Sequence, residues 1–181
     1  IKILIADDHE LVREGLKKVI KSEIDMKIVG EASDVAGIIK FVINKQCDII
    51  ILDLSGPVKD APSIYLFTKE FYSMVRNKLN KDGTVGVQAI SPIEPYRKIH
   101  IAIYNTLCYI FPVVRLFYAY IPSYGTQWGF AIASKKYDPK DVTKAEVEKK
   151  LTRRQIKNLK YYHSGMHKGL FTVPKDLIDD I

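Results

Sequence analysis

The sequence has little cysteine and no long uninterrupted apolar segment. Cys47 and Cys108 are its two cysteines among 181 residues, too few for a disulfide scaffold or a structural zinc site. Both lie in apolar stretches, so we expect buried, reduced thiols. The longest apolar stretch, residues 99–121, contains Pro112 and Arg115, which favours a buried helix, a turn and a strand over a membrane span. Since the chain begins directly with a strand-like segment, we predict a soluble, cytoplasmic protein without a membrane partner.

Aromatic residues are almost absent from the first third of the chain. Of 19 aromatic residues, only Phe41 lies before residue 56. Residues 1–55 carry a net charge of −2, whereas residues 56–181 carry +9. The overall charge of +7 suggests an anionic partner, but residues 135–168 alone account for +7. We interpret the basic run at residues 149–160 as a solvated helix face with a thin apolar stripe, and we do not expect a nucleic-acid partner.

The pattern of apolar residues predicts an α/β fold. Short apolar runs alternate with helical spacing up to residue 110, which indicates parallel strands joined by crossover helices. Two further strand-like runs are separated by a link that suits only an antiparallel hairpin. We therefore predict one α/β domain over residues 1–181, and the family resemblances given below imply a three-layer sandwich whose mostly parallel sheet has the order 2-1-3-4-6-5 with strand 6 antiparallel. The expected strands are residues 2–6, 27–32, 48–53, 84–90, 113–121 and 128–134, and the expected helices are residues 10–22, 35–43, 66–79 and 96–110.

Three carboxylates follow two of the predicted parallel strands. Asp7 and Asp8 end the first strand and Asp53 ends the third. Because ligands gather at the carboxyl ends of parallel strands, we expect the three side chains to share one pocket. Hard oxygen ligands in this number suit Mg²⁺, and the alternative is a set of capping and strand-ending aspartates.

The segments KILIADDHELVREGL and DIIILDLSGP resemble the receiver domain of a response regulator over residues 1–55. The resemblance implies a phosphoacceptor at Asp53 and Mg²⁺ held by Asp7, Asp8 and Asp53. It also requires a hydroxyl after the fourth strand, where Ser91 lies, and a lysine after the fifth. Because Lys135 and Lys136 would lie at the opposite edge of the sheet, we expect the phosphoryl switch to be broken.

The segments SIYLFTKEFYSMVRNKLNKDG and PVVRLFYAYIPSYGTQWGFAIASKKYDP resemble the C-terminal part of a spermidine synthase over residues 57–181. That family has a Rossmann-like sheet and transfers an aminopropyl group from decarboxylated S-adenosylmethionine to putrescine. The resemblance implies that Asp53 accepts the proton of the attacking amine and that Gln88 and Tyr124 contact the diamine. Gly56 stands where a second diamine-binding aspartate belongs, and the first half has no GxGxxG motif, so no cofactor is expected.

Another candidate metal site is the pair His163 and His167, spaced i, i+4. It has no evident third ligand, so we interpret both histidines as structural.

The two resemblances meet at residues 53–57. We interpret the chain as an engineered chimera of a receiver segment (1–55) and a synthase segment (56–181). In this interpretation it has no evolved activity and is not an enzyme, and Asp53, Gln88 and Tyr124 are vestigial site residues.

Two alternatives stay open. One is residual Mg²⁺ binding with Asp53 as phosphoacceptor, and the other is a polyamine- or nucleotide-binding remnant of an aminopropyltransferase. No partner is implied apart from a second copy, because an open edge strand favours a homodimer.

Overall fold

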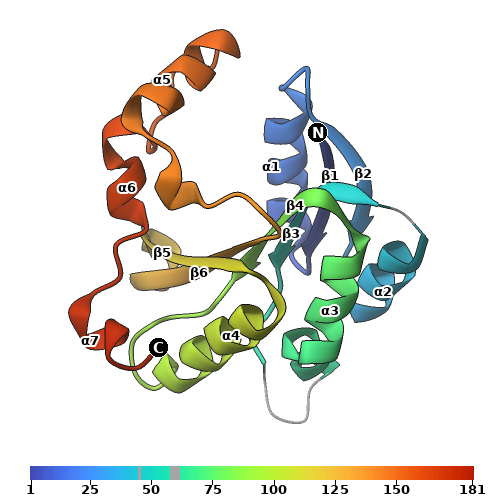
Figure 1. The fold of residues 1–181 in the computed structure, drawn as a ribbon. Coiled ribbons are helices and arrows are strands. Elements are labelled where there is room, and N and C mark those ends of the chain that lie inside the picture. The colour runs from blue at the N-terminus through green and yellow to red at the C-terminus, as the bar shows by residue number, and fades with distance from the viewer. Residues whose placement is uncertain (45, 58–61) are drawn as a thin grey trace.

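The protein folds around one six-stranded sheet of order β2-β1-β3-β4-β6-β5, seen in the computed structural model, which describes residues 1–44, 46–57 and 62–181 (Figure 1). Only β6 runs antiparallel to its neighbours β4 and β5. The predicted fold class, strand order and direction of strand 6 are confirmed. The strands are β1 (Lys2–Asp7), β2 (Lys27–Ala32), β3 (Cys47–Asp53), β4 (Leu79–Gln88), β5 (Val113–Ile121) and β6 (Thr126–Ser134).

Helices cover both faces of this sheet (Figure 1). α1 lies on one face, and α2, α3 and α4 lie on the other. The chain then continues through α5, α6 and α7. The α-helices are α1 (Glu10–Lys21), α2 (Val35–Asn44), α3 (Lys69–Lys78), α4 (Arg97–Ile110), α5 (Lys144–Arg153), α6 (His167–Leu170) and α7 (Lys175–Ile178), and the 3₁₀ helices are η1 (Pro62–Phe67), η2 (Pro122–Tyr124), η3 (Pro139–Asp141) and η4 (Ser164–Met166).

The stretch tested above as a membrane span divides as predicted, into the helix α4 and the strand β5. No helix in the described part of the chain is both long enough and apolar enough to cross a membrane. The prediction for one cysteine is wrong. Cys47 is buried in β3, but Cys108 is exposed, because it lies on the outer side of α4 while its neighbour Leu107 faces the core.

The main core runs without interruption from the first strands to the C-terminal helix. It joins Leu4 and Ile50 of the central strands to Val75 of α3, Leu107 of α4 and Leu177 of α7. On the opposite face, Ile3 and Ile5 pack with Ile20 of α1 in a smaller cluster. Residues on both sides of residues 53–57 therefore build one hydrophobic core.

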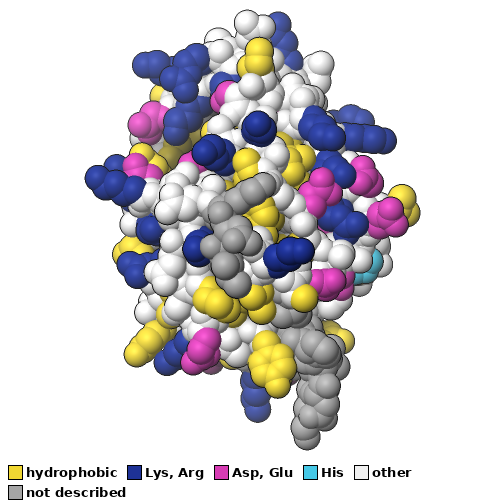
Figure 2. Space-filling model, turned by 90° about the vertical axis from the view of Figure 1, so that its right-hand side faces the viewer, with side chains coloured by type: hydrophobic (Ala, Val, Ile, Leu, Met, Phe, Trp, Pro, Cys, Tyr) yellow, Lys and Arg dark blue, Asp and Glu magenta, His cyan; other side chains and the backbone are white. Residues whose placement is uncertain are grey.

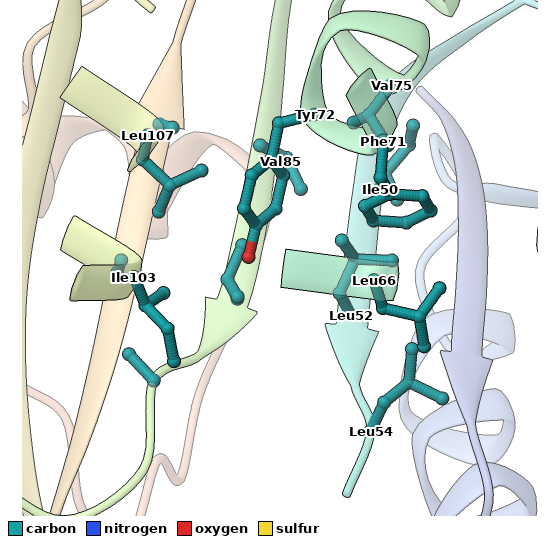
Figure 3. Close-up of a cluster of buried hydrophobic side chains, with 14 of the residues drawn as sticks. Ile50, Leu52, Leu54, Leu66, Phe71, Tyr72, Val75, Val85, Ile103 and Leu107 are labelled. Atoms are coloured by element: carbon teal, nitrogen blue, oxygen red, sulfur yellow. The ribbon is translucent and has the colours of Figure 1, made fainter. Parts of the chain in front are cut away.

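The Tyr72 side chain is fully buried in this core, close to Val85 (Figure 3). Its hydroxyl has no hydrogen-bond partner among the described residues, and burial raises its pKa. We expect Tyr72→Phe to stabilise the protein by about 1 kcal/mol, because an unsatisfied buried hydroxyl costs about 1–3 kcal/mol. Urea denaturation measures the change, and a loss of stability would show that the hydroxyl is satisfied in solution.

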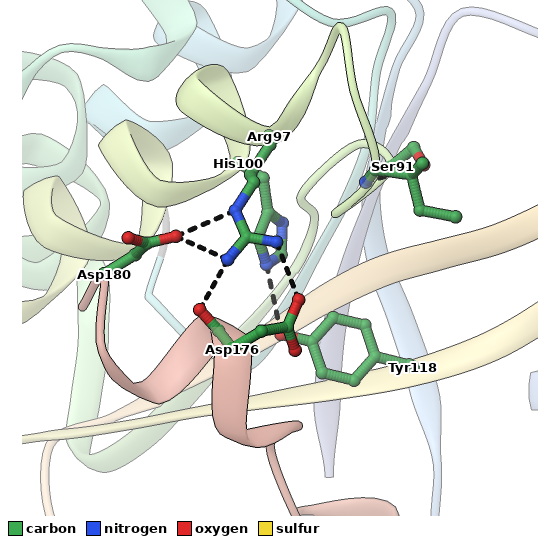
Figure 4. A network of polar contacts seen from close by, with 7 residues as sticks. Ser91, Arg97, His100, Tyr118, Asp176 and Asp180 are labelled. Atoms are coloured by element: carbon green, nitrogen blue, oxygen red, sulfur yellow. Dashed lines mark hydrogen bonds and ion pairs between the residues drawn. The ribbon is translucent and has the colours of Figure 1, made fainter.

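The C-terminal helix is held to the start of α4 by a network around Arg97 (Figure 4). The Arg97 guanidinium donates to the carboxylates of Asp176 and Asp180, each at 2.8 Å. Leu177, between these two aspartates, is buried in the core. The network therefore holds the C-terminal helix against the start of α4. The homodimer predicted from an open edge strand stays a prediction.

Charged side chains of both signs mix with apolar ones on the face that carries α2 and α3 (Figure 2).

Candidate active site

A cleft of about 300 Å³ opens at the carboxyl edge of the sheet, where the strand order reverses. The register pairs Asp7 of β1 directly with Asp53 of β3, so the two carboxylates come from adjacent strands. The cleft is lined by acidic, aromatic and small side chains: Asp7, Asp8, His9, Val12, Asp53, Leu54, Ser55, Gly56, Gln88, Ile90, Tyr96, Tyr124 and Trp128. The structure thus brings together the sequence-predicted residues Asp7, Asp8, Asp53, Gln88 and Tyr124.

Asp53 is the carboxylate with the most strongly altered acidity. Its burial, together with the nearby negative charges of Asp7 and Asp8, raises its pKa from 3.8 to about 6. No lysine or arginine forms an ion pair with Asp7, Asp8 or Asp53 within residues 1–44, 46–57 and 62–181. The cleft therefore carries negative charge that no lysine or arginine ion pair of the described chain offsets.

Asp7 is the most deeply buried of the three carboxylates, with a side chain 1% exposed. Its Oδ1 accepts a hydrogen bond from the backbone N–H of His9 at 2.7 Å, while its Oδ2 has no partner among the described residues. Burial raises the pKa of Asp7, and the hydrogen bond from His9 partly opposes this. The nearby Arg13 donates to the backbone carbonyl of Asp7 at 2.7 Å rather than to its carboxylate.

Asp8 and His9 complete the acidic corner of the cleft. The hydroxyl of Ser55 donates to Asp8 Oδ2, which links the end of β1 to the end of β3. The side chains of Asp7, Asp8 and His9 offer potential metal ligand atoms that all lie within 4.8 Å of one another. The predicted Mg²⁺ site consists of Asp7, Asp8 and Asp53, so it contains Asp53 in place of His9. That a magnesium ion binds there stays a prediction.

Three aromatic residues line the same cleft as the carboxylates. The rings of Tyr124 and Trp128 lie 4.4 Å apart between centroids, and Tyr96 lines the same cleft. The Trp128 indole N–H is buried without a hydrogen-bond partner among the described residues. Such rings attract ammonium groups through cation–π interactions and pack against alkyl chains. The sequence patterns identified Tyr124 but missed Tyr96 and Trp128.

Ile90 shapes the floor of the cleft in an unusual backbone conformation. Its φ of 58° lies in the left-handed region, which a β-branched residue rarely adopts. Its backbone N–H donates to Gln88 Oε1 at 3.0 Å, and its carbonyl accepts from Gly129 N–H at 2.9 Å. The conformation is therefore held from β4 and from β6 at once.

His100 supports the same turn from the core side. Its imidazole is fully buried, with Nδ1 2.7 Å from the carbonyl of Ala89 and Nε2 3.2 Å from the hydroxyl of Tyr118 (Figure 4). Since a carbonyl only accepts, Nδ1 carries the proton and Nε2 accepts from Tyr118. Burial lowers the pKa of His100, so the ring is neutral. No local sequence signal marks His100, because its partners come from other elements.

The residues that a receiver-type switch would need lie elsewhere. Ser91 is buried, and its hydroxyl donates to the carbonyl of Gln127 at 3.2 Å. Lys135 donates to the carbonyl of Leu79 at 3.0 Å, at the amino end of β4, and Lys136 pairs with Asp82. As the sequence predicts, neither lysine reaches the carboxyl edge of the sheet, so both are remote from Asp53.

The two tail histidines take part in local hydrogen bonds. His167 Nδ1 lies 2.7 Å from the Tyr162 hydroxyl, and its Nε2 lies 2.8 Å from the carbonyl of Pro139. His163 Nδ1 accepts from the N–H of Gly165. These contacts support the structural interpretation of both residues.

A larger hollow of about 440 Å³ lies between η1 and α4. Apolar side chains line most of it, and Lys98 is the only ionisable residue among its described lining residues. It therefore lacks the converging ionisable groups that make the smaller cleft the candidate site.

Comparison with known proteins places the chain beside enzymes of polyamine synthesis. A family model described as the spermine/spermidine synthase domain matches residues 10–146. The chain is 35% identical over 133 residues to a polyamine aminopropyltransferase of Sulfurisphaera tokodaii, covering 74% of this chain and 43% of that protein. It is 36% identical over 132 residues to polyamine aminopropyltransferase 2 of Hyperthermus butylicus, covering 72% and 43%. The chain thus spans less than half the length of these curated relatives.

Solved structures show the same fold. A spermidine synthase from Thermotoga maritima superposes with a TM-score of 0.70 at 23% identity, covering 99% of this chain and 69% of that one. A spermidine synthase in complex with the transition state analogue AdoDATO gives a TM-score of 0.68 at 22% identity, covering 99% and 68%.

These comparisons correct the chimera hypothesis. The family match begins at residue 10 and passes without a break through residues 53–57, where the hypothesis placed a junction. The prediction of an engineered chain without evolved activity is therefore wrong, as is the prediction that it is not an enzyme, since its relatives are aminopropyltransferases. The comparisons give no support to a receiver domain over residues 1–55. The chain belongs to the spermine/spermidine synthase family.

Proposed function

We propose that the cleft binds a polyamine and that Asp53 accepts a proton from its attacking amine during aminopropyl transfer. The observation that carries this proposal is a set of three carboxylates without a lysine or arginine ion pair among the described residues, in a cleft that three aromatic residues also line. The family membership and the names of the relatives support it. The activity itself is inferred, since the chain spans only part of those relatives.

The chemistry of the cleft matches that of a protonated alkyl amine. Ammonium groups pair with carboxylates, and the alkyl chain between them can lie against Tyr96, Tyr124 and Trp128. Gln88 lines the same cleft and can contact an amine through its amide. These features favour a linear polycation over a phosphate-bearing ligand, which the carboxylates would repel.

The proposed reaction needs one base near the attacking nitrogen. The nitrogen lone pair attacks the carbon of the aminopropyl group attached to the sulfonium sulfur of decarboxylated S-adenosylmethionine. The carbon–sulfur bond breaks, its electron pair leaves with the sulfur as a thioether, and the surplus N–H proton passes to Asp53. A carboxylate whose pKa is about 6 is ionised near neutral pH and is a better base than an ordinary aspartate.

The first half of the chain is compatible with this donor. A sulfonium donor carries positive charge and no phosphate, so the absence of a GxGxxG motif near Asp7 removes no phosphate contact. Glu31 lies near the end of β2, where Rossmann-type sheets place an acidic residue that binds ribose hydroxyls. Its carboxylate is 2.9 Å from Lys17 Nζ, which orients it from α1. We propose that Glu31 serves the donor in this way.

The binding of putrescine is expected to depend on pH through Asp53. Because the pKa of Asp53 is about 6, its carboxylate is largely neutral at pH 5 and ionised at pH 8. We expect affinity about tenfold lower at pH 5 than at pH 8, as one group titrating near 6 gives. Isothermal titration calorimetry across this range measures it. An affinity that stays constant would show that Asp53 does not hold the ammonium group.

The activity is tested by incubating the protein with putrescine and decarboxylated S-adenosylmethionine. We expect spermidine and methylthioadenosine in equal amounts, identified by mass spectrometry. Asp179→Asn removes an exposed carboxylate outside the cleft and serves as the control, which should retain both binding and product formation. Absence of product together with absence of putrescine binding in calorimetry would refute the proposed function.

A further inference from the structure

We propose that Asp7, Asp8 and His9 form a binding site for a divalent transition-metal ion at the acidic corner of the cleft. This site goes beyond the proposed polyamine function, because its donor set includes an imidazole and does not require Asp53. The three residues follow one another between the end of β1 and the start of α1. Their potential ligand atoms all lie within 4.8 Å of one another.

The distances between the donor atoms fit one shared ion. His9 Nδ1 lies 3.1 Å from Asp8 Oδ1 and 3.7 Å from Asp7 Oδ1. Metal bonds of about 2.1 Å separate two ligands by about 3.0 Å at a right angle and about 3.4 Å at a tetrahedral angle. The separation of 3.1 Å lies between these values and that of 3.7 Å is slightly larger than both, so small side-chain rotations would complete the three contacts.

An independent observation at Asp7 also points to a cation. This carboxylate is 1% exposed, lines the cleft, and has an Oδ2 without a hydrogen-bond partner among the described residues. Burying a carboxylate oxygen without a partner is costly, and a cation bound at the Asp7 carboxylate, whose Oδ1 is the oxygen measured against His9 Nδ1, would lower this cost. Arg13 cannot do so, because its guanidinium is directed to the backbone carbonyl of Asp7 and lies 3.9 Å from Glu31.

The donor set selects the class of ion. Imidazole together with carboxylates suits Mn²⁺, Co²⁺ or Zn²⁺, whereas Mg²⁺ and Ca²⁺ favour oxygen ligands alone. His9 is 68% exposed at the mouth of the cleft, so an ion can reach it directly from solvent. Water would fill the remaining coordination positions, as in metal sites with three protein ligands.

The test is titration of the full chain with Mn²⁺ and Co²⁺, without any amine, by calorimetry and by the visible spectrum of bound Co²⁺. We expect one ion per chain, with affinity reduced at least about tenfold by His9→Asn or by Asp8→Asn. Mg²⁺ should bind more weakly than Mn²⁺ and should be insensitive to His9→Asn. His163→Asn, a change at an exposed histidine outside the cleft, is the matched control and should leave the affinity unchanged.

Two results would overturn the proposal. One is absence of Mn²⁺ and Co²⁺ binding to the unaltered chain at millimolar concentrations. The other is wild-type affinity in the His9→Asn variant, which would show that any bound ion uses other ligands. Circular dichroism establishes that each variant is folded. Because no amine is present, failure of the polyamine proposal leaves this measurement unaffected, and the reverse also holds.

Discussion

Replacing Asp53 by asparagine is expected to slow aminopropyl transfer strongly while making the protein more stable at neutral pH. Asparagine is nearly the same size but can neither hold an ammonium group by charge nor accept its proton. Loss of a positioned base usually lowers a rate by about 10²–10⁴-fold. We expect a decrease in this range for product formation and at least about tenfold weaker putrescine binding, measured by mass spectrometry and calorimetry.

The stabilising effect follows from the pKa of Asp53. The folded protein raises it from 3.8 to about 6, so folding favours the protonated carboxyl group and the free energy of unfolding falls as pH rises through this interval. Above pH 6 the ionised carboxylate costs up to about 3 kcal/mol, since one pKa unit corresponds to about 1.4 kcal/mol. Asp53→Asn removes this cost. Urea denaturation at pH 4 and pH 7 should show a gain at pH 7 that nearly vanishes at pH 4.

The Asp179→Asn control distinguishes this effect from a general loss of negative charge. It should change neither the activity nor the difference in stability between pH 4 and pH 7 attributed to Asp53. If Asp53→Asn were less stable than the unaltered protein at pH 7, the carboxylate would have a cation partner in solution. If the variant retained wild-type turnover, another group would act as the base.

The sheet and the acidic corner were predictable because both rest on local patterns. The link between β5 and β6 is too short for a parallel crossover, which fixes β6 as antiparallel to β5, whereas the strand order was implied by the family resemblances. Asp7 and Asp53 follow apolar strands whose carboxyl ends meet at one edge. Reliance on local patterns also explains why the chain was wrongly interpreted as a chimera. The contrast in charge and aromatic content at residue 55 was interpreted as a junction, although one core and one family match cross it.

The residues that support the cleft from neighbouring elements, His100 and Gly129, could not be predicted from local sequence patterns. His100 lies on α4, and its role depends on the carbonyl of Ala89 and the hydroxyl of Tyr118, which lie on other elements. Gly129 is one residue of a strand-like run, and the approach of His100 and of the Ile90 carbonyl makes its missing side chain necessary. Contacts between distant segments carry no local signature, so these residues become visible only in three dimensions.

Gly129→Ala is therefore expected to be strongly destabilising. A Cβ atom at this position would lie 2.6 Å from His100 Cε1 and 2.7 Å from the carbonyl oxygen of Ile90. Neither neighbour can yield easily, since His100 is hydrogen-bonded to Ala89 and the Ile90 carbonyl accepts from Gly129 itself. We expect a loss of about 3 kcal/mol in urea denaturation, at the upper end of overpacking costs. Putrescine affinity should fall as well, because Ile90 forms part of the cleft.

Gly86→Ala in the neighbouring strand β4 is the matched control for this prediction. A Cβ atom at Gly86 would meet no atom within 4 Å, so the same chemical change there is expected to be neutral or to stabilise by up to about 1 kcal/mol through reduced backbone freedom of the unfolded chain. Equal effects of the two substitutions would show that β-sheet glycines matter here only through backbone entropy. A loss confined to Gly129→Ala would instead assign the cost to the contact with His100 and Ile90, and a parallel loss of putrescine affinity would show that this contact sets the shape of the cleft.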